Sequence, residues 1–408
     1  KAKGEDKYIA EKEISADLIE RIGAENHFTF TEDWRMGQVE NAAKLDKFIQ
    51  EVKELTGSRK VNLYGLSHGG QLTATYLYYY GAKGDVDRAI MDAPAIGGTQ
   101  LVVDLFEGNI HFDVATLIEY VEIGFRKEYE YEWLVEAFGF DRLNQAFNDI
   151  IHQYLLDIVI NFGSVWDFVP PDKYEEFKAK YLDPVENAEL IAKSDEMHYN
   201  AMAHMSDGLK RAQDAGTKIA IIANTEHDIG TSTGVNSDYI IDVHSASGAY
   251  CAPFGEKFPA DYKKQNTVCN DPTHWHISPE RDIDASCAYL PENTWFIKDM
   301  LHCKIHDGHK EMYNLFFYSD SVTDVWSNEK YPQFLQNDVN AKTLTPIGTQ
   351  ARPAASNGGS GSSKEPMTPQ TGSASFAAEL FRGGANAHKR KLQQPTAICF
   401  AVGCLFFI

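Results

Sequence analysis

A serine between two glycines is the first feature of this sequence that suggests chemistry. The stretch VNLYGLSHGGQL, residues 61–72, places Ser67 two residues after Gly65 and two residues before Gly69. In a G-x-S-x-G pattern between a strand and a helix, a sharp turn exposes the serine hydroxyl, and glycines let the helix pack closely. We therefore predict that Ser67 is a nucleophile. The amide of His68, at the helix start, would stabilise an oxyanion.

A serine nucleophile needs a histidine that takes its proton and a carboxylate that orients the histidine. Three histidines follow the apolar run NTWFIKDML, residues 293–301: His302, His306 and His309. The base should lie directly beyond a strand, at the sheet edge where the serine emerges, which favours His302 with His309 as the alternative. The candidate acids follow an earlier apolar run, residues 218–224: Glu226, Asp228, Asp238 and Asp242.

Short apolar runs and helical patterns alternate around these residues, which predicts an α/β fold with a doubly wound, mostly parallel sheet. We expect strands near residues 28–31, 61–64, 88–94, 218–224 and 293–301. Apolar residues at a spacing of three and four predict an amphipathic helix that Gly57 ends: Val39, Ala42, Leu45, Ile49, Val52 and Leu55. The run QLTATYLYYY predicts a second, largely buried helix.

The pattern divides the chain into four regions. Residues 1–100 form the first part of the core and carry Ser67, and residues 101–217 read as a helical, aromatic-rich cap. Residues 218–345 complete the core with the acid and the base, and the Gly/Ser/Pro-rich residues 346–408 predict a disordered tail. The apolar end, residues 397–408, is too short to span a bilayer.

The net charge of the chain and its cysteines indicate which binding partners and which cellular compartment to expect. A formal net charge of −21 argues against nucleic acid, because phosphate binding needs a basic surface. Four cysteines cluster in the second half of the chain. No C-x-x-C pair occurs among them, which argues against a zinc ribbon. We predict two disulfides, typical of an exported protein, with buried free thiols as the alternative and the pairing left open, among these four residues: Cys251, Cys269, Cys287 and Cys303.

An H-x-H pair, His274 and His276, could share one face of a strand, with Asp284 downstream. Two ligands without a clear third favour a structural hydrogen-bonding role over a metal site. We therefore expect neither a metal nor another cofactor.

The stretch EDWR at residues 32–35, the helix after it and KVNLYGLSHGG together resemble the lecithin:cholesterol acyltransferase-like branch of the α/β-hydrolase lipases. The resemblance covers roughly residues 15–100 and 218–335. The chain departs from the family pattern at Glu32, where a tyrosine is usual, and at Leu66 and His68, where the commoner residues are His and Met. The stretch NSDYIIDVHSA resembles the family's G-D-G-T-V-P segment, and this resemblance places the acid at Asp238.

The resemblance implies an α/β-hydrolase fold and a lipase or esterase that acts on lipid or acyl-ester substrates and contacts a lipid surface. A lipid acyltransferase, or a non-catalytic surface-binding protein on the same scaffold, are the alternatives. It also implies that the N-terminal strands of the fold, and the oxyanion loop that follows them, lie upstream of Lys1. The stretch MTPQTG, residues 367–372, resembles a sorting signal of bacterial surface proteins, although a plain disordered tail is the favoured interpretation. From the predicted disulfides we expect a secreted or cell-surface location in a bacterium.

Overall fold

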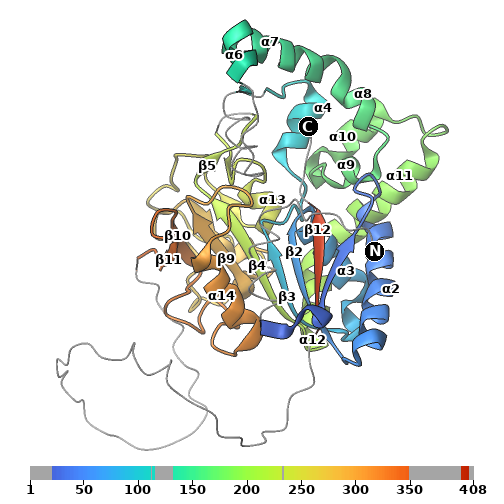
Figure 1. Ribbon diagram of the computed structural model, residues 1–408. Coiled ribbons are helices and arrows are strands. Elements are labelled where there is room, and N and C mark those ends of the chain that lie inside the picture. The colour runs from blue at the N-terminus through green and yellow to red at the C-terminus, as the bar shows by residue number, and fades with distance from the viewer. Residues whose placement is uncertain (1–20, 112, 115–131, 232–233, 349–396, 404–408) are drawn as a thin grey trace, which may run out of the picture.

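The structure of the protein is a computed structural model. It describes residues 21–111, 113–114, 132–231, 234–348 and 397–403. The described chain is an α/β protein built on an eight-stranded sheet in the order β1-β12-β2-β3-β4-β9-β10-β11 (Figure 1). All neighbouring pairs are parallel except the last pair, β10 and β11. The predicted α/β class and mostly parallel sheet are therefore confirmed.

The strands follow the apolar runs of the sequence. The sheet contains β1 (His27–Thr31), β2 (Val61–Ser67), β3 (Val86–Asp92), β4 (Lys218–Thr225), β9 (Thr294–Lys298), β10 (Phe334–Asp338), β11 (Thr343–Pro346) and β12 (Ala397–Gly403). Two short antiparallel pairs lie outside it: β5 (His227–Asp228) with β6 (Asn236–Ser237), and β7 (Tyr250–Cys251) with β8 (Ile283–Asp284). Strand β2 runs up to Ser67 itself, so the turn that follows it is abrupt.

Helices cover both faces of the sheet. On one face, α2 (Gln38–Thr56), α3 (His68–Tyr80) and α12 (Met205–Asp214) share a core with alternate strand residues such as Leu63 and Ile221. On the other face, α14 (Asp307–Tyr318) packs on the intervening residues, including Ile90 and Ile222. Helix α2 confirms the predicted amphipathic helix, which Gly57 ends in a left-handed conformation, although Leu55 is exposed rather than buried.

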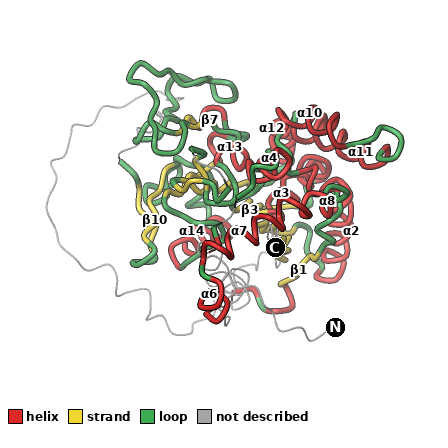
Figure 2. The backbone as a smooth tube through the Cα atoms, turned by 90° about the horizontal axis from the view of Figure 1, so that it is seen from above, coloured by secondary structure: helices red, strands yellow, loops and turns green. Residues whose placement is uncertain are grey.

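The region predicted to be a cap, residues 101–217, contains helices and loops but no strand among its described residues, and its last helix, α12, packs on the sheet. It contains α4 (Gln100–Glu107), α6 (Glu132–Phe138), α7 (Phe140–Ile150), α8 (Leu156–Val159), α9 (Gly163–Asp167), α10 (Pro171–Tyr181) and α11 (Ala188–Asp195). Two π-helical turns, η3 (Ile151–Leu155) and η4 (Glu196–Met202), also belong to it. A core of buried aromatic side chains, including Phe106, Trp166 and Phe177, holds this region together. Figure 1 shows α4, α6, α7 and α8 beyond the end of the sheet at which β2 ends, and Figure 2 looks down on them from that side.

Short helical segments complete the described chain: η1 (Ala24–Asn26) and η2 (Gly81–Lys83), then α13 (Val243–Ser247) and the 3₁₀ turns η5 (Ala285–Cys287) and η6 (Pro291–Asn293). No described helix is both long enough and apolar enough to span a membrane.

The end of the chain corrects one prediction. Residues 397–403, assigned to a disordered tail, form β12, which lies between β1 and β2 and pairs in parallel with both. Gly403 lies opposite Ser67 in this register. An unbroken apolar run suits a strand that is covered on both faces of a parallel sheet. The stretch MTPQTG lies outside the described residues.

Candidate active site

The backbone at Ser67 is strained in the way that a strand-to-helix turn requires. Ser67 has φ 57° and ψ −117°, a region that L-residues rarely adopt, and α3 begins at the next residue. A Cβ atom at Gly65 would overlap the carbonyl oxygen of Gly69, and one at Gly70 would lie 2.6 Å from Cβ of Pro94. The absence of a side chain at Gly65 and at Gly70 therefore lets α3 cross closely over the sheet.

The structure brings Ser67, His302 and Asp238 together. The Ser67 Oγ lies 2.8 Å from Nε2 of His302, and Nδ1 of the same ring lies 2.7 Å from Oδ2 of Asp238. All three residues are buried. His302 reaches both partners, as the predicted arrangement of base, serine and acid requires. It does so from the loop after β9, because that strand ends at Lys298 and not at residue 301 as predicted.

The loop that carries Asp238 is itself held in place. The second carboxylate oxygen of Asp238, Oδ1, accepts hydrogen bonds from the amides of Ile240 and Ile241, at 3.0 and 2.7 Å. The His302 amide donates to the Asp238 carbonyl at 2.9 Å, which fastens the two loops to each other. A carboxylate accepts only, so His302 donates from Nδ1 and keeps Nε2 as the acceptor for the serine hydroxyl. This is the tautomer that a general base needs.

The alternative histidines have other partners. His306 caps the N-terminus of α14, and its Nε2 lies 2.5 Å from Oδ1 of Asn337. His309 is fully buried in the first turn of α14, and burial lowers the pKa of its imidazole to about 3. The candidate His309 as base is therefore not supported by the geometry.

Two of the alternative acids accept hydrogen bonds from nearby backbone amides. Asp242 caps α13 by accepting the Ser245 amide at 2.8 Å, and Asp228 accepts the Val235 amide at 3.0 Å. Burial and a hydrogen bond with Asp282 raise the pKa of Glu226 to about 7.

The amide of His68 belongs to the first turn of α3, where helix amides have no partner within the helix and the helix dipole favours negative charge. Its position beside Ser67 is the one predicted for an oxyanion donor. The His68 ring, which is buried, packs against Phe168 and has Nδ1 2.8 Å from Oε1 of Glu32. Glu32 and His68 are two of the positions at which the chain departs from the lipase pattern, and they contact each other.

A second buried carboxylate, Asp92, lies at the end of β3, close enough for the charges of His302 and Asp238 to act on it. Its Oδ2 accepts hydrogen bonds from the hydroxyls of Tyr64 and Tyr313, at 2.7 and 2.8 Å. Burial raises the pKa of Asp92 to about 6, with the charges of His302 and Asp238 acting on it in opposite directions. Sequence reasoning missed this residue because the run that contains it reads only as an apolar strand.

The predicted disulfides are not formed: among the described residues, no disulfide joins any two of Cys251, Cys269, Cys287 and Cys303. Clustering in the sequence did not bring these thiols to bonding distance. The sulfur of Cys269 instead lies 3.5 Å from Nδ1 of His274. The Asp284 carboxylate accepts hydrogen bonds from the hydroxyls of Ser286 and Tyr262, at 2.6 and 2.9 Å.

Comparisons with protein-family models, with curated proteins and with solved structures found no match to this chain.

Proposed function

We propose that this chain is a serine hydrolase of carboxylic esters with an α/β-hydrolase fold, and that its substrates are lipid esters. The observation that carries the proposal is the continuous hydrogen-bonded relay from Ser67 through His302 to Asp238. Such an enzyme needs three parts. They are a strained serine at a strand-to-helix turn, a base beyond a later strand, and an acid that lies between the two in the sequence.

The mechanism follows from the donors and acceptors. His302 Nε2 takes the hydroxyl proton as Ser67 Oγ attacks the ester carbonyl, and Asp238 stabilises the imidazolium that forms. The His68 amide donates to the carbonyl oxygen as it becomes negative. His302 then gives the proton to the departing alkoxide, which leaves as the alcohol. Water, deprotonated by the same nitrogen, attacks the acyl-enzyme and releases the acid and Ser67.

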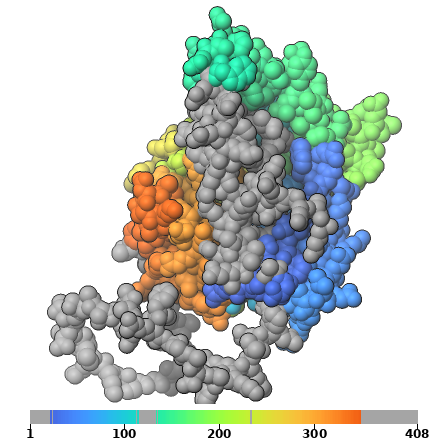
Figure 3. All heavy atoms as spheres, viewed as in Figure 1, coloured from blue at the N-terminus to red at the C-terminus, as the bar shows by residue number. Residues whose placement is uncertain are grey.

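The surface of the cap supports a lipid substrate. Several large apolar side chains between α6 and α8 are at least two-fifths exposed: Trp133, Phe138, Phe140, Ile150, Tyr154 and Ile158. Their helices form one end of the molecule (Figure 3). Soluble proteins rarely gather exposed apolar side chains unless the surface contacts a partner or a lipid phase.

The test of the hydrolase is ester turnover by the purified chain on p-nitrophenyl acyl esters of increasing chain length. We expect activity in the wild type and a loss of at least about 10⁴-fold in Ser67→Ala, the scale on which triad removal acts. Ser164→Ala is the matched control, because Ser164 is also fully buried but lies on α9. An inactive wild type, or an active Ser67→Ala variant, would favour the non-catalytic scaffold.

The lipid preference has a separate test. Trp133→Ser and Phe140→Ser should lower hydrolysis of an emulsified triacylglycerol while leaving a soluble short-chain ester unaffected. Leu55→Ser removes a still more exposed apolar side chain from α2, away from the cap, and should change neither rate. Equal effects of all three substitutions would contradict a lipid-contacting role for the cap.

A further inference from the structure

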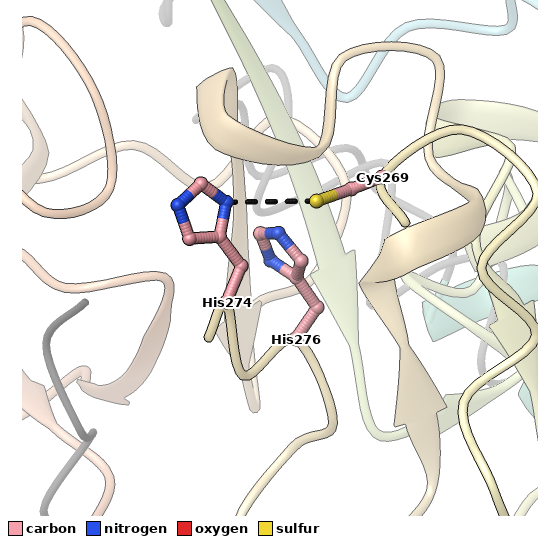
Figure 4. A group of neighbouring side chains, drawn as sticks. All are labelled: Cys269, His274 and His276. Carbon is pink, nitrogen blue, oxygen red and sulfur yellow. Dashed lines mark hydrogen bonds between the residues drawn. The ribbon is translucent and has the colours of Figure 1, made fainter. Parts of the chain in front are cut away.

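Cys269, His274 and His276 gather in the long connection between β7 and β8, which is stabilised by little regular structure. Only a small apolar cluster, Ala252, Phe258 and Ile277 with Tyr262, packs within the described part of this connection. One potential ligand atom from each of the three side chains lies within 4.8 Å of the others (Figure 4). A thiol and two imidazoles are the ligand types that zinc prefers, whereas calcium and magnesium require oxygen ligands.

The spacing of the first pair suits a shared metal ion. Sγ of Cys269 lies 3.5 Å from Nδ1 of His274, as Figure 4 shows. Zinc bonds of about 2.3 Å to sulfur and about 2.05 Å to nitrogen, at a tetrahedral angle, place the two ligand atoms about 3.6 Å apart. The two side chains are therefore already at the separation that a common zinc ion would impose.

His276 is prepared as a ligand by its neighbour Gln333. The Gln333 amide nitrogen donates to the carbonyls of Pro291 and Thr294, at 2.6 and 3.0 Å, which assigns the other amide atom as oxygen. That oxygen lies 2.8 Å from Nδ1 of His276, so Nδ1 carries the hydrogen and Nε2 carries a lone pair. Zinc-binding histidines are held by this kind of second hydrogen bond.

The lone pair of His276 has no protein partner among the described residues. His276 is fully buried, and within that part of the chain its Nε2 makes no hydrogen bond. A buried polar atom without a partner is unfavourable by about 1–3 kcal/mol, so native proteins rarely retain one without a role. A metal ion would satisfy it.

Glu292 is a source of a fourth ligand beside this group. Its Oε1 lies 2.9 Å from Nδ1 of His274, and its side chain is about half exposed, at 48%. Ligand oxygen and nitrogen atoms on a tetrahedral zinc ion lie about 3.4 Å apart, so this pair would open slightly on binding.

We propose that Cys269, His274 and His276 bind one zinc ion, with Glu292 or water completing a tetrahedral site. The ion would cross-link the β7–β8 connection and fasten it, through His276 and Gln333, to the sheet beside β9 and β10. The site shares no residue with the Ser67 relay, and the proposal does not depend on ester hydrolysis.

The test uses the full chain, stripped with a chelator and then titrated with Zn²⁺ or Co²⁺. We expect one zinc per chain after removal of excess metal, and a thiolate-to-cobalt charge-transfer band in the near ultraviolet. Cys269→Ser should abolish the band, and His276→Ala should lower zinc affinity at least about tenfold. The controls Cys287→Ser and His204→Ala change a half-buried cysteine and an exposed histidine, and both should retain the wild-type behaviour.

A second readout uses the wild type alone, so that it does not depend on the folding of a variant. Zinc should slow alkylation of Cys269, followed by peptide mass spectrometry, and the chelator should restore the rate. Sub-stoichiometric zinc, unchanged zinc binding in Cys269→Ser, or equal alkylation of Cys269 with and without zinc would overturn the site. Loss of zinc from the Cys287→Ser control would contradict this choice of ligands.

Discussion

Nε2 of His302 lies 2.8 Å from Oγ of Ser67, although 235 residues separate the two in the chain. Ser67 ends β2, and His302 follows β9, which is separated from β2 in the sheet by β3 and β4. The carboxyl ends of parallel strands meet at one edge of a sheet, so loops from distant parts of the sequence converge there. The contact depends on the order of the strands and on the strained turn at Ser67.

Asp238→Asn should lower ester turnover by roughly 10³–10⁴-fold with little change in fold. The amide oxygen can keep the hydrogen bonds from Ile240 and Ile241, which leaves the NH₂ group facing His302. Nδ1 would then have to accept, and Nε2 would carry the hydrogen and no longer accept the serine proton. Steady-state kinetics measure the effect. Asp228→Asn is the matched control and should keep wild-type kcat, and a similar loss in both variants would argue against Asp238 as the acid.

Gly65→Ala should destabilise the chain by roughly 1–3 kcal/mol or more, because the new methyl group overlaps the Gly69 carbonyl oxygen. It should also lower kcat, since relief of the overlap moves Ser67. Gly57→Ala is the control that shows the effect of an unfavourable backbone conformation without steric overlap. Gly57 has φ 70°, and a methyl group there would contact nothing within 4 Å. That variant should lose about 1 kcal/mol and no activity. Urea unfolding and kcat measure both effects, and equal kcat values would contradict the tight turn.

Asp92 should make the fold less stable as pH rises from about 4 to about 6. Its folded pKa of about 6 lies above the ordinary value of 3.8, so over that window the unfolded chain has already released the proton that the folded chain keeps. The difference amounts to at most about 3 kcal/mol. Asp92→Asn should remove this component, so the variant gains stability relative to the wild type as pH rises from 4 to 7. Urea unfolding at both pH values measures it.

Asp320→Asn is the contrasting control for that measurement. Asp320 is exposed, and hydrogen bonds from Lys218 and Arg88 lower the pKa of its carboxyl. Its contribution to stability is therefore present at neutral pH and lost on acidification, the opposite sense to Asp92. An identical pH dependence in the wild type and Asp92→Asn would show that Asp92 titrates normally.

Removal of residues 349–408 should destabilise the sheet, because β12 separates β1 from β2 and pairs with both. Without it, each neighbour presents an unpaired edge, which favours aggregation. We expect a lower Tm and poor solubility. A chain that lacks only residues 356–375, from the Gly/Ser/Pro-rich stretch, keeps the strand and should unfold near the wild-type Tm. A wild-type Tm in the truncated chain would contradict the position of β12.

The sequence was sufficient to predict the parts of the site that depend on local pattern. The turn at Ser67 follows from a strand, two glycines and a helix, and His302 follows from its place directly after an apolar run. The choice of Asp238 among four carboxylates needed the family resemblance, because nothing local distinguishes an acid that orients a histidine from one that caps a helix, as Asp242 does.

Contacts between distant segments were not predictable in this way. The short apolar run at 397–403 carries no signal for the strands it joins, so β12 was missed. Glu32 and His68 were both recognised as unusual, but their contact needs β1 and β2 to be placed in one sheet. The disulfide prediction for the four clustered cysteines was wrong, since proximity in sequence does not bring two sulfur atoms to bonding distance.

Covalent labelling with a fluorophosphonate probe tests the central claim most directly, because the probe reacts with serines that a neighbouring base activates. We predict a single adduct on the native chain, located at Ser67 by peptide mass spectrometry. It should be absent from denatured protein and from Ser67→Ala, and it should form far more slowly in His302→Ala. A native chain that stays unlabelled, an adduct on another serine, or an unchanged rate in His302→Ala would contradict the account.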